Sequence, residues 1–197
     1  MEIVRAARTP EIAEHKNVQD YLAGNFVFPE PPKTEAQKNY GPTRTLEDED
    51  LRMYRIGKEV FLRDAHCVTC HQANGQGMPG VYPPLAKSEW LDDDERLIKI
   101  TLKGLWGPIE VAGQHFDPSK GVPPMMGFGA MLNDIELAAV LSYVRQSFGN
   151  DGELITADAV RKVRQATEGR VNFYAVEELL KEHPLKQKSS AESAPLK

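Results

Sequence analysis

The sequence predicts an all-α domain with an extended N-terminal arm and extra C-terminal helices. Three observations support this prediction. Apolar residues recur at helical spacing in residues 46–64, 92–105 and 133–148, and the second and third of these segments begin with capping residues. Residues 1–47 lack such periodicity, and further helical patterns follow residue 150.

The chain of 197 residues is long enough for one domain with extensions. We predict an N-terminal arm or linker over 1–47, a main domain over 48–149 and a C-terminal helical extension over 150–184. The tail, 185–197, is expected to be disordered, because it is terminal, short and poor in apolar residues.

Composition limits the possible partners. The chain is 41% hydrophobic and 27% charged, with a formal net charge of -5. An acidic balance without a basic patch argues against nucleic acid and against an anionic membrane surface as partners. No apolar run in the sequence reaches the length of a transmembrane helix.

The N-terminal arm contains one helical pattern and one extended stretch. A helix is predicted over 11–23, where the apolar anchors are weak. Prolines keep residues 26–32 extended. The polar, turn-rich residues 33–44 favour a linker or an arm that lies over the domain surface.

The first helix of the main domain is predicted over 46–64, where Leu51, Tyr54 and Phe61 recur at helical spacing. Gly57 lies in the middle of this helix, where it costs about 1 kcal/mol relative to alanine. A glycine at this cost indicates a packing purpose. We therefore expect another element to cross closely at Gly57.

Cys67, Cys70 and His71 form a C-x-x-C-H stretch, which is the attachment signature of a c-type haem. Two thiols three positions apart can add to the two vinyl groups on one edge of a porphyrin and form two thioethers. The histidine follows at once, so its imidazole lies under the ring and ligates the iron as the proximal ligand. The sequence therefore predicts one covalent haem c.

Three other roles of a C-x-x-C pair fit the sequence less well. A thioredoxin-like redox motif belongs in a βαβ pattern, but the residues before Cys67 are predicted to be helical. Structural zinc needs four ligands, whereas the chain has 2 cysteines, and His66 is an unsuitable fourth partner. A disulfide between Cys67 and Cys70 would close too small a loop to constrain the chain much.

Turn and helix signals follow the haem motif. Glycines and a proline mark a loop over 75–80, and Trp90 lies in a predicted short turn. The helix over 92–105 is expected to start with a capping box formed by Asp92 and Glu95.

The remaining elements include one hairpin and three helices. A small β-hairpin is predicted over 109–116, followed by a proline- and glycine-rich loop. The clearest helix spans 133–148, where Asn133 and Glu136 form a capping box. Two further helices are predicted over 156–167 and 171–182.

A haem iron with one histidine needs, or leaves open, a sixth ligand. Met125 lies in the proline- and glycine-rich loop before the helix at 133–148, where a thioether can be held against the iron without a regular backbone. Met126 and Met131 are neighbouring candidates. His115 is the main histidine competitor, although we expect it to be an exposed loop residue.

Three segments taken together resemble a class I monohaem cytochrome c, over residues 48–149. They are residues 57–61 ahead of the C-x-x-C-H motif, residues 82–85, and Met125 ahead of residues 137–145. The resemblance implies the class I cytochrome c fold around one covalent haem. In that fold the first and last helices cross, which would bring Gly57 and Phe61 against Tyr143.

The resemblance also implies roles for two site residues. The family holds its proximal imidazole with a proline carbonyl, which by position is Pro83 accepting from His71. Its ligand methionine usually reads M-P-x-F-G, and Met125 is in register with that pattern. The sequence departs from it at Met126 and Gly127, where prolines are usual, so Met126 remains an alternative ligand.

Residues 82–86, 105–109 and 156–164 are similar to a narrower group. Its members are cytochrome domains that serve periplasmic dehydrogenases, often quinoprotein enzymes, or that belong to respiratory complexes. The resemblance implies one-electron transfer through a haem with histidine and methionine ligands. The redox partners would be such a donor and an acceptor cytochrome or oxidase, and the chain would not itself be an enzyme.

The surroundings of the haem suggest how a partner would dock. Trp90, Trp106 and Arg96 are candidates for packing against the ring or for contacts with its propionates. We expect the exposed haem edge to be flanked by residues that are mostly apolar or neutral: Gln72, Ala73, Val81, Met126, Gly127 and Phe128. No ring of lysines is evident, so docking through a small hydrophobic patch is predicted.

Two other functions remain open. A peroxidase-like haem enzyme or a haem gas sensor would need an open sixth site. The chain could also be an electron-entry domain or a subunit of a larger assembly, since a free shuttle needs neither extension. Haem attachment predicts a periplasmic or other extracytoplasmic location. We expect the leader to have been removed, because no apolar segment follows Met1.

Overall fold

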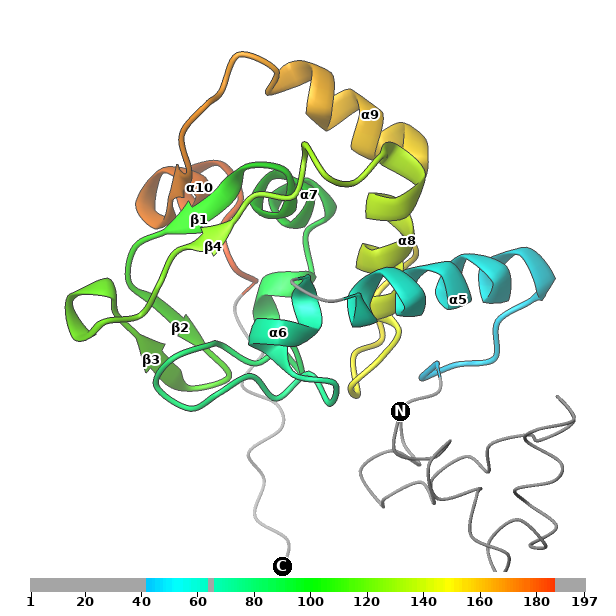
Figure 1. Cartoon of the computed structure of the whole chain (residues 1–197), viewed down its shortest axis with the longest axis horizontal. Coiled ribbons are helices and arrows are strands. Elements are labelled where there is room, and N and C mark those ends of the chain that lie inside the picture. The colour runs from blue at the N-terminus through cyan, green and yellow to red at the C-terminus, as the bar shows by residue number, and fades with distance from the viewer. Residues whose placement is uncertain (1–41, 64–65, 187–197) are drawn as a thin grey trace, which may run out of the picture. The chain divides into compact units, whose positions relative to one another are not determined.

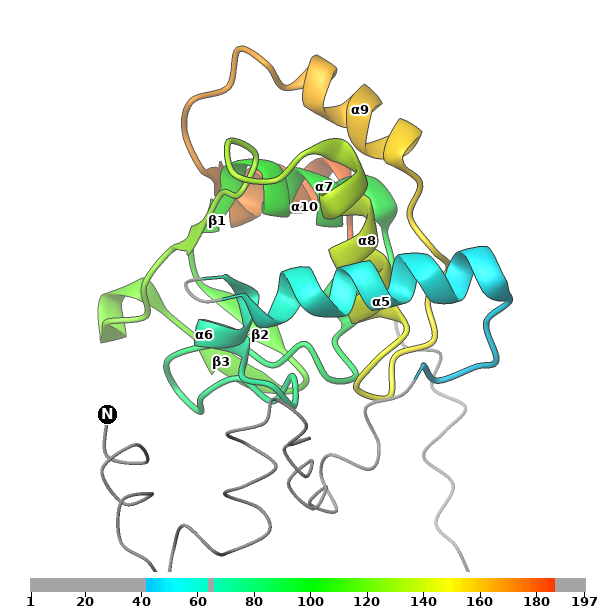
Figure 2. The ribbon, with the colours of Figure 1, turned by 45° about the vertical axis from the view of Figure 1, so that its right-hand side comes forward.

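Helices α5 (Asp48–Leu62) and α8 (Asp134–Arg145) cross and pack against each other (Figures 1 and 2). The computed structural model describes residues 42–63 and 66–186. At the crossing, a Cβ added to Gly57 would overlap the carbonyl oxygen of Ala139 and lie 2.7 Å from Cβ of Tyr143. The ring of Tyr143 lies 5.3 Å from that of Phe61. The predicted close approach at Gly57 is therefore confirmed.

The larger hydrophobic core surrounds this crossing. Helices α7 (Asp94–Lys103) and α9 (Ala157–Ala166) both pack against α8. The most deeply buried apolar residues of the cluster are Val60, Phe61, Ile98, Leu137, Ala138, Val140, Tyr143 and Val160. The hydroxyl of Tyr54 lies 3.0 Å from Oγ of Ser147, which satisfies both groups inside the core.

The two predicted capping boxes had different outcomes. Before α8, the Asn133 side chain accepts from the backbone N–H of Glu136 at 2.9 Å, and Glu136 accepts in return from the N–H of Asn133 at 3.2 Å. This box is confirmed. Helix α7 is instead capped by Asp93, which accepts from the N–H of Arg96 at 2.7 Å. The predicted cap at Asp92 is wrong, because the carboxylate of Asp92 pairs with the Arg96 guanidinium.

Replacing Asn133 with alanine is expected to lower the free energy of unfolding by about 1 kcal/mol, because the first turn of α8 loses an acceptor. Thermal unfolding followed by circular dichroism measures the change. Asn172→Ala is the control, since it keeps the backbone carbonyl that Asn172 offers to Arg170. It should shift stability by less than about 0.5 kcal/mol, and equal shifts in both variants would contradict the capping role.

The fold also contains short strands, so the all-α prediction is wrong for part of the chain. Strands β2 (Ile109–Val111) and β3 (Gln114–Phe116) form the predicted hairpin. The sequence did not predict a three-stranded sheet of order β4-β1-β5, made of β1 (Gly104–Trp106), β4 (Met125–Met126) and β5 (Tyr174–Ala175). These strands are two or three residues long and pair over long sequence separations, so no local alternation marks them.

The C-terminal residues complete a second core. Helix α10 (Val176–Glu182) starts later than predicted, because residues 174–175 form β5, which runs parallel to β1. Tyr174, Val176 and Leu179 are buried in a cluster with residues of the hairpin and of β1. The shorter elements are α6 (Cys67–His71) and the 3-10 helices η1 (Glu89–Leu91) and η2 (Pro118–Lys120).

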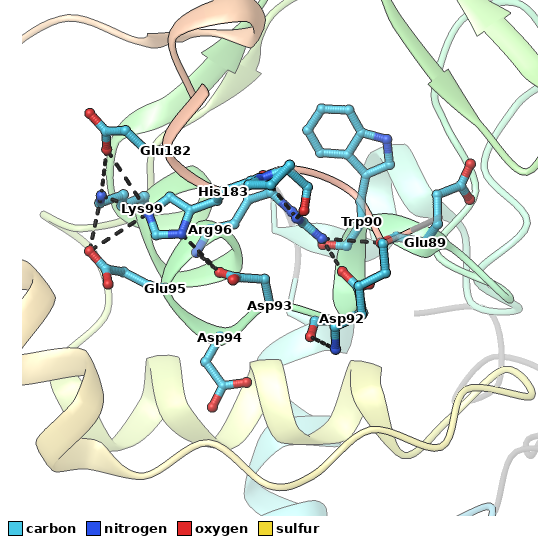
Figure 3. A network of polar contacts seen from close by, with 12 residues as sticks. Glu89, Trp90, Asp92, Asp93, Asp94, Glu95, Arg96, Lys99, Glu182 and His183 are labelled. Atoms are coloured by element: carbon cyan, nitrogen blue, oxygen red, sulfur yellow. Dashed lines mark hydrogen bonds and ion pairs between the residues drawn. The ribbon is translucent and has the colours of Figure 1, made fainter. Parts of the chain in front are cut away.

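Arg96 fastens the end of α10 to α7 (Figure 3). Its side chain is completely buried, at 0% exposure, and pairs with Asp92. The guanidinium also donates to the carbonyl oxygens of Glu89, Trp90, His183 and Pro184. Beside it, the ammonium of Lys99 lies 2.9 Å from the carboxylate of Glu182 and 3.0 Å from that of Glu95.

Some predictions lie outside the described residues. These are the helix over 11–23, the extended stretch over 26–32, most of the linker or arm over 33–44 and nearly all of the predicted disordered tail. Within the described ranges, no helix is both long enough and apolar enough to cross a bilayer.

Candidate haem site

The C-x-x-C-H residues line an apolar cavity of about 430 Å³. An adjoining cavity of about 90 Å³ shares several of its lining residues. The residues common to both cavities are Cys67, His71, Pro83, Leu105, Ile109 and Met125. Residues from both halves of the domain therefore line both cavities.

Helix α6 presents the two thiols and the imidazole together. Cys67 and Cys70 form no disulfide, and both retain partial exposure where they line the cavity. The apolar surroundings raise the pKa of the Cys67 thiol to about 11, because burial disfavours the thiolate. A single turn of helix thus offers the groups that covalent haem attachment requires.

A backbone carbonyl orients the imidazole of His71. Nδ1 of His71 lies 2.9 Å from the carbonyl oxygen of Pro83. Because a carbonyl can only accept, Nδ1 carries the hydrogen and Nε2 keeps the lone pair that ligates a metal. Burial lowers the pKa of His71, and the hydrogen bond to Pro83 opposes this effect. The neutral imidazole, which is the form that ligates iron, is therefore favoured.

The loop between His71 and Pro83 is closed by its own backbone. The N–H of Gly77 donates to the carbonyl of His71 at 3.0 Å, and the N–H of Leu85 donates to the carbonyl of Gly75 at 2.7 Å. These bonds bring Pro83 back over the imidazole from twelve positions along the chain. The contact implied by the family resemblance is present in the structure.

The four candidates for the sixth ligand occupy different positions. Met125 is half-buried in β4 and lines both cavities with His71. Met126 and Met131 are 57% and 56% exposed and line only the larger cavity. His115 is 54% exposed, lies 3.7 Å from the carboxylate of Asp117 and lines neither cavity.

Only some of the other residues expected to surround the haem line the two cavities. Trp90 lines the smaller cavity, and Trp106 lines the larger one. Arg96 lines neither, because its guanidinium is committed to Asp92 and to backbone carbonyls. Of the residues expected at the haem edge, Met126, Gly127 and Phe128 line the larger cavity, whereas Gln72, Ala73 and Val81 do not.

Several wall residues were not predicted. Ile109 and Val111 come from the hairpin and Val122 from the loop after it. The sequence of the hairpin could have indicated Ile109 and Val111 together, because residues two apart on a strand point to the same face. Nothing local marks Val122, whose position depends on the path of the whole loop.

The donor set and the walls fit a covalently attached haem. Two thiols and one neutral imidazole lie at one side of an apolar space, and a thioether lines the same space. Thiols can form the thioether links, and the imidazole and the methionine sulfur are the axial ligands that c-type cytochromes use.

Comparisons with known proteins agree with this geometry. The cytochrome c family model matches residues 54–148. The chain is 41% identical over 110 residues to cytochrome c-552 of Thermus thermophilus, covering 51% of this chain and 79% of that protein. It is 31% identical over 112 residues to the cytochrome c subunit of a quinone alcohol dehydrogenase from Gluconobacter oxydans, covering 55% of this chain and 22% of that subunit.

A further relative is the fructose dehydrogenase cytochrome subunit of Gluconobacter japonicus. It is 31% identical over 113 residues, which cover 52% of this chain and 21% of that subunit. The match to the Thermus protein spans most of that protein's length. The cofactor of the chain is haem c, which is attached covalently, and its role belongs to electron transport. The chain is therefore a member of the cytochrome c family.

Proposed function

We propose that the domain transfers single electrons through a haem iron held between His71 and Met125. The observation that carries this proposal is that both side chains line the same two apolar cavities. When bound, haem c supplies an iron that gains and loses one electron. Cys67 and Cys70 provide the thioether links, and Pro83 orients the proximal imidazole.

Each of these residues has a separate task. The hydrogen bond from Nδ1 of His71 to Pro83 fixes the ring and makes Nε2 a better donor. A methionine ligand favours the reduced iron and raises the reduction potential. The apolar walls keep water from the metal and add to this effect, because they disfavour the extra charge of the oxidised form.

A haem enzyme of the peroxidase type, or a haem gas sensor, is the alternative. Either would need an open or easily vacated sixth position. The half-buried position of Met125 in β4, paired with Leu105 in the sheet, supports a filled position instead. We therefore propose that the chain is an electron carrier or electron-transfer subunit and not itself an enzyme.

The proposed partners are a periplasmic dehydrogenase or respiratory complex as donor and a cytochrome or oxidase as acceptor. Two relatives are cytochrome subunits of dehydrogenases, and the chain spans 22% and 21% of their lengths. This supports a dehydrogenase partner, an extracytoplasmic location and a role as part of a larger assembly. We keep 48–149 as the proposed cytochrome domain, with 1–47 and 150–184 as its extensions.

The proposed docking surface is the rim of the larger cavity. Trp106, Met126 and Met131 line this cavity and are 45%, 57% and 56% exposed. Exposed apolar side chains in such a position favour a small hydrophobic contact with limited electrostatic steering.

The ferric absorption spectrum tests the ligation. We expect a weak sulfur-to-iron charge-transfer band at the red end of the spectrum, lost in Met125→Ala and kept in Met126→Ala. The reduction potential of Met125→Ala should fall by about 0.1–0.3 V, a fraction of the range that axial ligands span. Met126→Ala is the matched control, because the neighbouring residue is an exposed methionine on the same strand.

Two results would contradict the proposal. A band lost in Met126→Ala but kept in Met125→Ala would assign the ligand to Met126. A wild-type protein that lacks the band and binds carbon monoxide or cyanide readily would favour the enzyme or sensor.

A further inference from the structure

Arg164 of helix α9 donates hydrogen bonds from all three guanidinium nitrogens to residues 129–134. Nη1 donates to the carbonyl of Gly129 at 2.5 Å, and Nη2 donates to the carbonyl of Leu132 at 2.8 Å. Nε donates to the carboxylate of Asp134 at 2.7 Å, at the first residue of α8. The side chain is 29% exposed, so these contacts are partly shielded from water.

The segment from 127 to 132 is also hydrogen-bonded to the backbone of α7. The N–H of Phe128 donates to the carbonyl of Thr101 at 2.8 Å, and the N–H of Gly129 donates to that of Leu102 at 3.1 Å. A Cβ on Gly129 would lie 2.7 Å from the oxygen of Leu102, so the backbones are in close contact. The end of α7 and the guanidinium of Arg164 therefore both hold this segment.

This segment continues directly from β4, the strand that contains Met125. Strand β4 pairs antiparallel with β1, where Met125 lies opposite Leu105. On its other edge β1 pairs with β5, where Leu105 lies opposite Tyr174. Residues C-terminal to α8 thus support the methionine strand in two ways, through Arg164 on the segment that follows it and through β5 on the far edge of β1.

We propose that Arg164 positions the backbone that carries Met125 and so keeps this thioether on the iron; the inference rests on the ligation proposed above. A methionine side chain is long, flexible and uncharged, so it does not hold its own position. Its backbone must be fixed from outside. The planar, charged fork of Arg164 can fix two carbonyls and a carboxylate at once, which the point charge of a lysine cannot do.

The test compares three variants of the haem-loaded protein, all at a temperature where circular dichroism shows them folded. In Arg164→Ala we expect a weaker charge-transfer band and cyanide binding to the ferric protein about tenfold faster, which corresponds to a barrier lowered by about 1.4 kcal/mol. Arg164→Lys should fall between the alanine variant and the wild type. Arg161→Ala is the matched control, because Arg161 lies one turn earlier on α9 and contacts Asp134 and Asp158.

The outcomes separate the two proposals. If the wild-type protein lacks the band, the methionine ligation and this inference both fail. If the wild type has the band and Arg164→Ala keeps both the band and the wild-type cyanide rate while unfolding at a lower temperature, Arg164 only stabilises the fold and this inference alone fails. An equal change of the band and of the cyanide rate in Arg161→Ala would also overturn the inference, since the loss of positive charge near Asp134 would then explain both variants.

Discussion

Replacing Gly57 with alanine is expected to lower the free energy of unfolding by about 3 kcal/mol or more, because the added methyl group meets backbone that cannot move aside. The new Cβ would lie 2.5 Å from the carbonyl carbon of Ala139 and 2.7 Å from Cβ of Tyr143. Alanine is intrinsically better than glycine in a helix by about 1 kcal/mol, so the steric clash must exceed this gain. Denaturant unfolding of the haem-loaded protein measures the difference.

Gly169→Ala is the matched control for this substitution. Gly169 is exposed, and a Cβ added there would meet no atom within 4 Å. Its free energy of unfolding should therefore change by less than about 0.5 kcal/mol. If Gly57→Ala were as mild, the two central helices would have to separate easily, and the close crossing would not be a main source of stability.

Replacing Arg96 with leucine is expected to cost about 3–5 kcal/mol of stability, the range for breaking a buried charged group away from its partners. The variant leaves the carboxylate of Asp92 and the carbonyls of Glu89, Trp90, His183 and Pro184 without their donor. Because two of these carbonyls belong to the C-terminal end, limited proteolysis should cut after β5 sooner in the variant than in the wild type.

Lys186→Ala is the control for the Arg96 variant. Lys186 also bonds across from the C-terminal end, donating to the carbonyl of Asp92 at 3.2 Å, but it is exposed. Its loss should change stability by less than about 0.5 kcal/mol. Equal stability of Arg96→Leu and the wild type would mean that other contacts, such as those of Lys99, hold the C-terminal end.

The parts of the fold that the sequence predicted depend on residues close together in the sequence, or on the absence of a side chain at a glycine. The box of Asn133 and Glu136 lies within one helical turn, and the hairpin at 109–116 is closed by a short turn. Gly57 indicated the helix crossing, because a glycine inside a helix lowers its stability and its presence suggests that another element packs closely there. The range of the first helix, 46–64, was likewise within two residues of the observed α5.

Several contacts between residues far apart in the sequence were predicted wrongly or not at all. Arg96 was a candidate for a haem contact as well as for an ordinary core role, and its guanidinium in fact binds carbonyls 87 and 88 positions away. The sheet that holds Met125 joins strands near residues 105, 125 and 174. No periodicity within any one of these segments indicates its partner, because pairing over such separations is decided by the path of the chain.

The sequence by itself determined the chemistry of this protein. The order Cys67, Cys70, His71 specifies covalent haem attachment, because the spacing of two thiols and an imidazole matches the porphyrin edge and the iron beneath it. The tertiary structure decided how that chemistry is surrounded and supported. It placed the Pro83 carbonyl on the imidazole and Met125 beside the same cavity, as the family resemblance had implied. It also set Arg164 against the segment after Met125, which no pattern in the sequence had indicated. The physical reason is that a ligand set depends on local spacing, whereas the support of each ligand depends on backbone groups brought together only by folding.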